Sequence, residues 1–196
     1  NSGKKVLVLG AGGVGAWAAR ELAARGHEVV ATTSNGQTAR ALSCLGVSHM
    51  EWHWEPGASW RDILALNASH WLVTVPPRMG PEWAKAFHNA LQDAAAEGHV
   101  ERLVWTSSTA VYEASKTGTL VESDEGHHIS RHSGVDMLQL EDIHRRGNVP
   151  FVAMRLGGLF GVKRHPVKAL LRRGRIENGD GHVQWVHERD AAAACV

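Results

Sequence analysis

The sequence predicts an α/β fold, in which helices cover both faces of a parallel sheet of about six or seven strands. Two observations indicate this class. Short aliphatic runs alternate with longer stretches of helix-forming residues along all 196 residues, without an internal repeat or a linker. The first aliphatic run, residues 4–9, leads directly into a glycine-rich turn and a helix. We therefore expect one doubly wound domain spanning residues 1–196.

The glycine-rich turn makes this prediction more specific. Its glycines have the spacing G-x-G-x-x-G between a buried strand and a helix expected at residues 13–25. The first glycine permits a tight turn, the second lets a pyrophosphate approach the backbone, and the third brings helix and strand close together. Free N–H groups at the positive helix terminus receive the pyrophosphate. The turn thus predicts a Rossmann-type, NAD(P)-binding domain with contacts from Gly10, Gly12, Gly13, Val14 and Gly15.

The alternation continues through the first half of the chain. Runs rich in β-branched and aromatic residues predict strands at residues 28–33, 47–54 and 70–75. Helix formers between them predict helices at residues 38–45 and 60–66. Gly26 and Gly46 follow the first two helices of the chain and end them. The third strand is expected to carry Met50, Trp52 and Trp54 on one face.

The second half repeats the pattern. A long helix is expected at residues 81–97, opened by a proline and ended by a glycine. Residues 115–131 are polar and predict a loop. Strands are expected at residues 100–106, 149–156 and 183–186. Further helices are expected at residues 134–146 and from about residue 188. The apolar face of the first consists of Met137, Leu138, Leu140 and Ile143.

The end of the second strand bears on the form of the cofactor. In NAD-preferring sites an acidic residue there binds the adenosine ribose, but Thr33 and Ser34 occupy this position. Hydroxyl groups donate hydrogen bonds to a 2′-phosphate, which an aspartate would repel, and Arg40 offers a positive charge nearby. Alternatively, Arg40 is a solvated helix residue. We favour NADP(H), with Pro76 and Ser107 completing the expected cofactor contacts after the fourth and fifth strands.

Composition excludes several function classes. The net charge of +1 argues against a general nucleic-acid role. No apolar run approaches the roughly 20 residues needed to span a bilayer. Cys44 and Cys195 have no metal or redox spacing, so we expect reduced, largely buried thiols in a cytoplasmic protein. His128 and His132 lie four apart, but no cysteine or carboxylate spacing completes a metal site, and none is expected.

Three further segments carry a family resemblance. Residues 104–112 contain Ser-Ser-x-x-Val-Tyr, similar to SS-x-x-VYG, and residues 155–161 resemble R-x-x-x-x-YG. Residues 186–192 resemble VHV-x-D-x-A. With the glycine turn, these motifs resemble the extended short-chain dehydrogenase/reductases of the nucleotide-sugar epimerase/dehydratase superfamily. The chain looks most like an atypical, YeeZ-like subgroup.

The resemblance also exposes a departure in the catalytic residues. The family's Tyr-x-x-x-Lys should open the helix at residues 134–146, but alignment puts the tyrosine near Arg131 and the lysine near Val135. Neither residue can exchange the substrate proton or lower the pKa of a tyrosine. Ser108 does align with the family's catalytic Ser/Thr, and alone it can bind a substrate oxygen.

One literal Tyr-x-x-x-Lys remains, formed by Tyr112 and Lys116, and Tyr112 is the chain's only tyrosine. It lies four residues after Ser108, where the family has its non-catalytic tyrosine. Residues 117–119 would not continue a helix that holds both side chains on one face. Tyr112 and Lys116 are candidate catalytic residues, and the alternative is that Tyr112 lines the rim of the cleft.

A basic cluster follows the sixth strand. The resemblance implies that it faces the substrate and contacts a diphosphate, and the alternative is a solvated basic face. Its members are Lys163, Arg164, His165, Lys168, Arg172, Arg173 and Arg175. Residues 157–196 would then begin a substrate-facing region, and we expect the C-terminal part of the family fold to be absent from this sequence.

These observations predict an NAD(P)(H)-binding protein that acts as a weak or atypical oxidoreductase, epimerase or dehydratase. The resemblance implies a small-molecule substrate, such as a nucleotide sugar or another phosphorylated carbonyl compound. No nucleic-acid or membrane partner is expected, and the sequence does not indicate an oligomeric state. The competing prediction is a non-enzymatic sensor or scaffold that binds the dinucleotide and has lost the catalytic pair.

Overall fold

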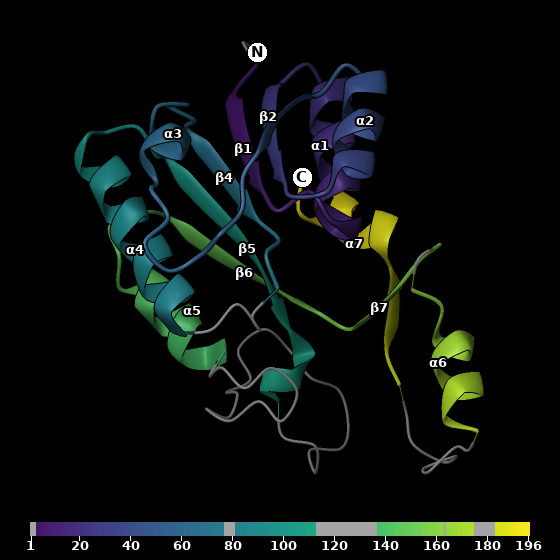
Figure 1. Ribbon diagram of the computed structural model, residues 1–196. Coiled ribbons are helices and arrows are strands. Elements are labelled where there is room, and N and C mark those ends of the chain that lie inside the picture. Colours follow the sequence, from purple (N-terminus) through teal and green to yellow (C-terminus); the bar gives the residue numbers. More distant parts are fainter. Residues whose placement is uncertain (1–2, 77–80, 113–136, 163, 175–182) are drawn as a thin grey trace.

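The computed structural model describes residues 3–76, 81–112, 137–162, 164–174 and 183–196. Its main sheet has six strands: β1 (Lys5–Leu9), β2 (Glu28–Thr33), β3 (Ser48–Glu51), β4 (His70–Val73), β5 (Arg102–Ser108) and β6 (Phe151–Leu156). They are all parallel, in the order β3-β2-β1-β4-β5-β6 (Figure 1). This is the strand order of a Rossmann fold, so the predicted fold class is confirmed.

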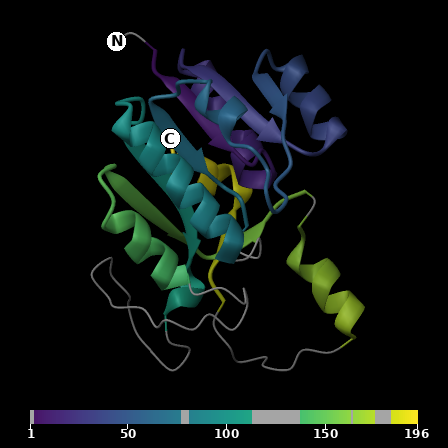
Figure 2. The same cartoon turned by 60° about the vertical axis from the view of Figure 1, so that its left-hand side comes forward.

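Helices cover both faces of the sheet (Figures 1 and 2). One face carries α1 (Gly13–Ala24), α2 (Gly36–Cys44) and α7 (Glu188–Ala194). The opposite face carries α3 (Arg61–Leu64), α4 (Pro81–Ala96) and α5 (Met137–Arg145). The predicted helices at residues 13–25 and 81–97 therefore match within one residue at their C-terminal ends. The helix from residue 188 begins where the sequence indicated.

Strand β1 shows why the sheet is buried on both faces. Its side chains alternate, so that Leu7 and Leu9 enter the core beneath α4. Val6 and Val8 enter the other core, which also contains residues of α1 and α7. A continuous aliphatic run is therefore required here, because neither face of the strand meets water.

Beyond the main sheet, the structure has elements that the sequence predicted only in part. Strands β7 (Gly158–Phe160) and β8 (Trp185–His187) form a separate two-stranded parallel sheet. The basic cluster includes a helix, α6 (Pro166–Arg173), which stands beside this small sheet (Figure 1). A short 3₁₀ helix, η2 (Thr109–Val111), follows β5. The strand expected at residues 183–186 is shorter and lies later, as β8.

Burial in two helices differs in part from what the sequence indicated. In α5, Ile143 is only partly buried, whereas Glu141 and His144 are buried with Met137 and Leu138. Both polar side chains contact residues that are distant in sequence, such as Ser107 and Trp105. The periodicity of a helix does not predict such contacts. Cys44 was expected to be buried but is exposed at the end of α2.

Candidate functional site

A cleft of about 930 Å³ opens at the carboxyl ends of the parallel strands. It lies where the strand order reverses, since β1 has β2 on one side and β4 on the other. Ligands of open α/β sheets bind at such a switch point. The glycine turn, the end of β2, the loop after β3 and the end of β4 all contribute lining residues.

The glycine turn is held tightly from both neighbouring strands. Gly10 has a φ of +97°, a left-handed conformation that favours glycine. Its N–H donates to the Thr32 hydroxyl at 2.9 Å, and its carbonyl accepts from the Thr74 hydroxyl. Ala11 donates its N–H to the Thr32 carbonyl at 2.7 Å. The turn is therefore fixed before any ligand arrives.

The space around the other two motif glycines, Gly12 and Gly15, differs. A Cβ on Gly12 would meet no atom within 4 Å, so the backbone there is open. A Cβ on Gly15 would lie 2.3 Å from the Gly10 carbonyl oxygen, so helix α1 and the turn pack too closely for alanine. Val14 is buried in the core, and Gly13 lines the cleft.

The end of β2 forms the next wall of the cleft. Thr33, Ser34 and Asn35 all line it, and the first two are among the expected cofactor contacts. The Thr33 hydroxyl accepts from the Asn35 N–H at 3.1 Å, and the Asn35 side chain caps α2. Arg40 is exposed on α2 and is not among the residues that line the cleft. The structure thus places Thr33 and Ser34 together and leaves Arg40 outside.

An aromatic wall closes the cleft beyond β3. It contains Trp52 and Trp54, whose rings pack against Trp60 with centroids at 4.9 and 6.1 Å. Trp83 of α4 also lines the cleft, and its Nε1 is buried without a partner among the described residues. The alternation of Trp52 and Trp54 with polar residues indicated that both side chains lie on the same face of the strand. It did not indicate that this face lines a cleft.

At the end of β5 the hydroxyl groups of Ser107 and Ser108 both have partners within the protein. The Ser107 hydroxyl donates to Glu141 Oε1 at 2.5 Å, in a fully buried contact. The Ser108 hydroxyl accepts from the Ala110 N–H at 3.1 Å and so caps η2. Pro76, after β4, lines the cleft, whereas neither serine is among its lining residues.

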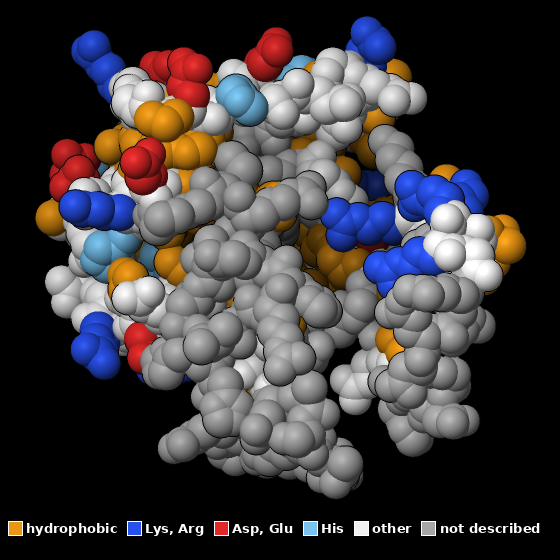
Figure 3. Space-filling model, turned by 60° about the horizontal axis from the view of Figure 1, so that its bottom comes forward, with side chains coloured by type: hydrophobic (Ala, Val, Ile, Leu, Met, Phe, Trp, Pro, Cys, Tyr) orange, Lys and Arg blue, Asp and Glu red, His pale blue; other side chains and the backbone are white. Residues whose placement is uncertain are grey.

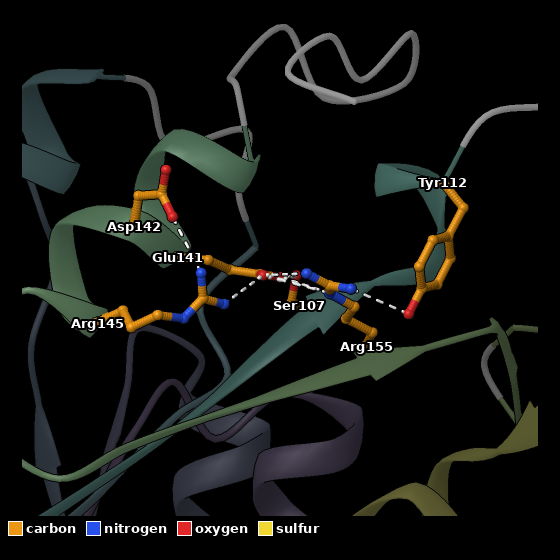
Figure 4. A network of polar contacts seen from close by, with 6 residues as sticks. All are labelled: Ser107, Tyr112, Glu141, Asp142, Arg145 and Arg155. Atoms are coloured by element: carbon orange, nitrogen blue, oxygen red, sulfur yellow. Dashed lines mark hydrogen bonds and ion pairs between the residues drawn. The ribbon is translucent and has the colours of Figure 1, made fainter. Parts of the chain in front are cut away.

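Glu141 is the centre of a polar network that joins β5, β6 and α5 (Figure 4). Its carboxylate is 0% exposed and accepts from Arg155 Nη2 at 2.8 Å and from Arg155 Nε at 3.2 Å. Arg145 approaches it at 3.7 Å from the exposed end of α5. Hydrogen bonding to Glu141 raises the pKa of Arg155 above its ordinary value. The two side chains thus form a close ion pair that is shielded from solvent.

Arg155 also binds Tyr112. Its Nη1 donates to the Tyr112 hydroxyl at 3.0 Å, and its guanidinium carbon lies 5.1 Å from the ring centroid (Figure 4). The backbone of Tyr112 is extended, with φ −81° and ψ 151°, so η2 ends before it. A Tyr-x-x-x-Lys pair needs helical backbone to place both side chains on one face. Lys116 lies outside the described residues.

The basic cluster borders the cleft at one point. Arg164 lines the cleft, and both its N–H and its carbonyl bond to Gly161 in a tight turn. His165, Lys168, Arg172 and Arg173 are exposed. Figure 3 shows Lys and Arg side chains gathered beside a hollow in the surface. Lys163 and Arg175 lie outside the described residues.

Sequence reasoning missed several lining residues. They include Trp17, Asn35, Trp52, His53, Trp54, Thr74, Val75, Trp83, His187 and Glu188, whereas Arg164 belongs to the basic cluster that was expected to face the substrate. His187 and Glu188 belong to the segment that resembles VHV-x-D-x-A, which was the available signal. Among the described residues, no group of three or more His, Cys, Asp or Glu side chains gathers as metal ligands. His128 and His132 fall outside that part of the chain.

No described helix has the length and apolar character required to cross a membrane. No protein-family model matches the sequence. Protein YeeZ of Escherichia coli K12 is 30% identical over 198 aligned residues, which cover 97% of this chain and 71% of YeeZ.

Solved structures share the fold. The UDP-glucose-4-epimerase from Stenotrophomonas maltophila, with bound NAD and formylated UDP-arabinopyranose, superposes with a TM-score of 0.76 and 18% identity. That match covers 97% of this chain and 72% of the epimerase. The Bordetella bronchiseptica enzyme WbmH, in complex with NAD⁺, gives a TM-score of 0.73 at 19% identity, over 98% of this chain and 71% of WbmH.

The relation to YeeZ spans nearly the whole chain and most of the relative. The superpositions with the two solved structures likewise span nearly the whole chain, so the similarity of fold includes the main sheet. This chain is therefore a member of the YeeZ family.

Proposed function

We propose that the chain binds a nicotinamide dinucleotide in the cleft and acts as an atypical oxidoreductase of the epimerase/dehydratase type. The observation that carries this proposal is the cleft itself, which joins the glycine turn to the ends of β2 and β4. When bound, the dinucleotide supplies or accepts a hydride. The protein residues bind it, orient it and exclude water.

The shape of the glycine turn fits such a ligand. The open side of Gly12 leaves room for a pyrophosphate, and the adjoining α1 has twelve residues whose N-terminus attracts an anion. Gly13 and Val14 provide N–H groups in the first turn of α1. Trp52 and Trp54 offer apolar surface on the β3 side of the same cleft. In this proposal the cofactor extends from that side toward β4.

NADP(H) is the form that we favour. The residues lining the β2 side of the cleft include Thr33, Ser34, Asn35 and Thr38, and none of the described lining residues on that side is acidic. Hydroxyl and amide groups tolerate a 2′-phosphate, whereas a carboxylate would repel it. Arg40 does not support this preference, because it does not line the cleft.

The substrate in this proposal is a small carbonyl or hydroxyl compound, with a nucleotide sugar as the leading class. MoeE5, which has the same fold with a TM-score of 0.67, was solved in complex with UDP-glucose and NAD. In this chain Arg164 borders the cleft and offers a cation for a phosphorylated substrate. Ser108 lies at the end of β5 and would bind a substrate oxygen.

A non-enzymatic sensor is the second candidate. It is favoured by the engagement of Tyr112 with Arg155, since that contact gives the only tyrosine a structural partner. A sensor would bind the dinucleotide without turning over any substrate. Both candidates require the same binding site, so binding is tested first.

The test replaces Gly12, where a side chain would occupy the open approach of the pyrophosphate. Calorimetry with NADPH and NADH should show binding by the parent protein and none by Gly12→Val. Because a Cβ at this position meets no protein atom within 4 Å, the thermal unfolding of the variant should be almost unchanged. Equal affinity of the folded variant and the parent would contradict the proposed site.

A further inference from the structure

Glu188 is a buried carboxylate in the cleft that no part of the proposed function uses. It begins α7, is 8% exposed and lines the cleft beside the glycine turn. In the segment that resembles VHV-x-D-x-A it stands at the position of the second valine. An ionisable group has therefore taken an apolar position at the wall of the ligand site.

Two glycines make room for this carboxylate. A Cβ on Gly13 would lie 2.3 Å from Glu188 Oε1, and a Cβ on Gly161 would lie 2.5 Å from Oε2. Each oxygen therefore packs directly against the backbone of a glycine, at a position where any other residue would place its Cβ. Gly13 is the first residue of α1, so the carboxylate is fixed beside the helix terminus that would receive the pyrophosphate.

The charge of Glu188 is not paired by the described residues. No hydrogen bond or ion pair joins its carboxylate to another side chain in that part of the chain. Arg189, the next residue, is directed toward the ring of Trp17, with 5.9 Å between its guanidinium carbon and the ring centroid. Arg164 also lines the cleft but forms no ion pair with Glu188.

A carboxylate at this place opposes a pyrophosphate. The N-terminus of α1 attracts an anion, but Glu188 already places one negative charge next to Gly13. Like charges within a few ångströms repel strongly where the surroundings exclude water. Because Gly13 and Gly161 have no side chains, both carboxylate oxygens of Glu188 fit in this position without a steric clash.

We propose that Glu188 lowers the affinity of the cleft for the dinucleotide, so that the cofactor is an exchangeable co-substrate and not a permanently bound group. This inference rests on the proposed function. A net oxidation or reduction transfers one hydride and one proton between substrate and cofactor, and it leaves the cofactor changed. That cofactor must then depart and be replaced. An epimerisation restores its cofactor in every cycle, so it gains nothing from weak binding.

The test uses Glu188→Gln, which keeps the shape of the side chain and removes its charge. Calorimetry with NADPH should show affinity at least tenfold higher than that of the parent, about 1.4 kcal/mol. Stopped-flow displacement should show a correspondingly slower dissociation. Adenosine, which carries no phosphate, should bind the two proteins equally, because the repulsion acts on the pyrophosphate.

Asp190→Asn is the matched control. Asp190 lies in the same first turn of α7 but is exposed and does not line the cleft. Asp190→Asn removes one negative charge from the N-terminus of α7, as Glu188→Gln does. Because Asp190 does not line the cleft, the NADPH affinity of this variant should stay within about twofold of the parent. Thermal unfolding of each variant reports whether the fold persists, and Glu188→Ala provides a second uncharged side chain.

The outcomes separate this inference from the proposed function. If the parent binds NADPH and the folded Glu188 variants bind it equally or more weakly, Glu188 does not oppose the cofactor and the inference is overturned. Binding by the parent that requires Mg²⁺, with the requirement lost in Glu188→Gln, would also overturn it, because the carboxylate would then hold a bridging cation. If no protein binds NADPH, the proposed function fails as well.

Discussion

Replacing Arg155 with methionine should strongly destabilise the protein, because it leaves Glu141 as an uncompensated buried charge. The Glu141 side chain is 0% exposed and the Arg155 side chain 16% exposed, and their closest contact is 2.8 Å. Removing one partner of a buried ion pair costs about 3–5 kcal/mol. Ser107 continues to donate to Glu141, so we expect a loss of about 3 kcal/mol, at the lower end of that range.

The assay is urea unfolding at pH 7, followed by tryptophan fluorescence. The unfolding midpoint should fall while the slope stays constant, which reports a change in stability alone. The double variant Arg155→Met/Glu141→Gln removes both charges, so it should be more stable than Arg155→Met by at least about 1 kcal/mol.

Arg145→Met provides the matched control. Arg145 contacts Glu141 only at 3.7 Å and its side chain is 58% exposed. Surface ion pairs contribute about 0–1 kcal/mol, so this variant should lose less than 1 kcal/mol. Equal losses of stability in Arg155→Met and Arg145→Met, or no recovery when Glu141→Gln is added to Arg155→Met, would show that Glu141 does not depend on Arg155.

Three further predictions concern acid stability, cofactor choice and catalysis. Burial, reinforced by His88, lowers the pKa of His144 to about 4, so stability should fall as pH drops from about 6.5 toward about 4. Between about pH 7 and pH 5 the loss is roughly 2 kcal/mol by urea unfolding, and His144→Leu should flatten this dependence. Thr33→Asp should weaken NADPH relative to NADH by about tenfold or more in calorimetry, and an unchanged ratio would refute the hydroxyl argument. In an NADPH-oxidation assay over sugars and carbonyl compounds, the parent should turn over slowly, because it lacks a positioned acid–base group that typically supplies about 10²–10⁴-fold, and Ser108→Ala should lower the rate further. Loss of a rapid turnover in Tyr112→Phe alone would instead make Tyr112 and Lys116 the catalytic pair.

The parts of the fold predicted from sequence are those governed by local signals. Residues 4–9 predict a buried strand because their side chains enter cores on both faces of the sheet, and residues 28–33 place Val29 and Ala31 in one of these cores. The glycine turn could also be predicted, because its geometry requires glycine at two positions. Gly10 has a positive φ, and Gly15 packs too closely against Gly10 for a side chain. Such requirements arise within a few residues of the turn, so the sequence carries them directly.

Long-range partners explain what could not be predicted. Glu141 lies on the buried face of α5 because Arg155 of β6 and Ser107 of β5 donate hydrogen bonds to its carboxylate. The pairing of Gly158 with Trp185 joins two strands that are separated in sequence by the whole of α6. Each of these strands is too short for its residue pattern to predict the pairing. The turn at Gly161, which admits the Glu188 carboxylate, likewise depends on contacts distant in sequence.

The candidate site was predictable to a similar extent. The glycine turn, Thr33, Ser34 and Pro76 line one cleft, as residue patterns at strand ends indicated. Ser107 was expected beside the cofactor, but its hydroxyl bonds Glu141 instead. The opposite wall, with Trp54, depends on packing against Trp60 that no spacing rule provides.

A crystal structure of the protein grown with saturating NADPH would test the central claim most directly. We predict a dinucleotide in the cleft, with pyrophosphate oxygens roughly 2.7–3.2 Å from the N–H groups of Gly13 and Val14. Its adenosine should lie on the side of Thr33 and Trp52. An empty cleft at saturating NADPH, or a dinucleotide bound away from the glycine turn, would contradict the account.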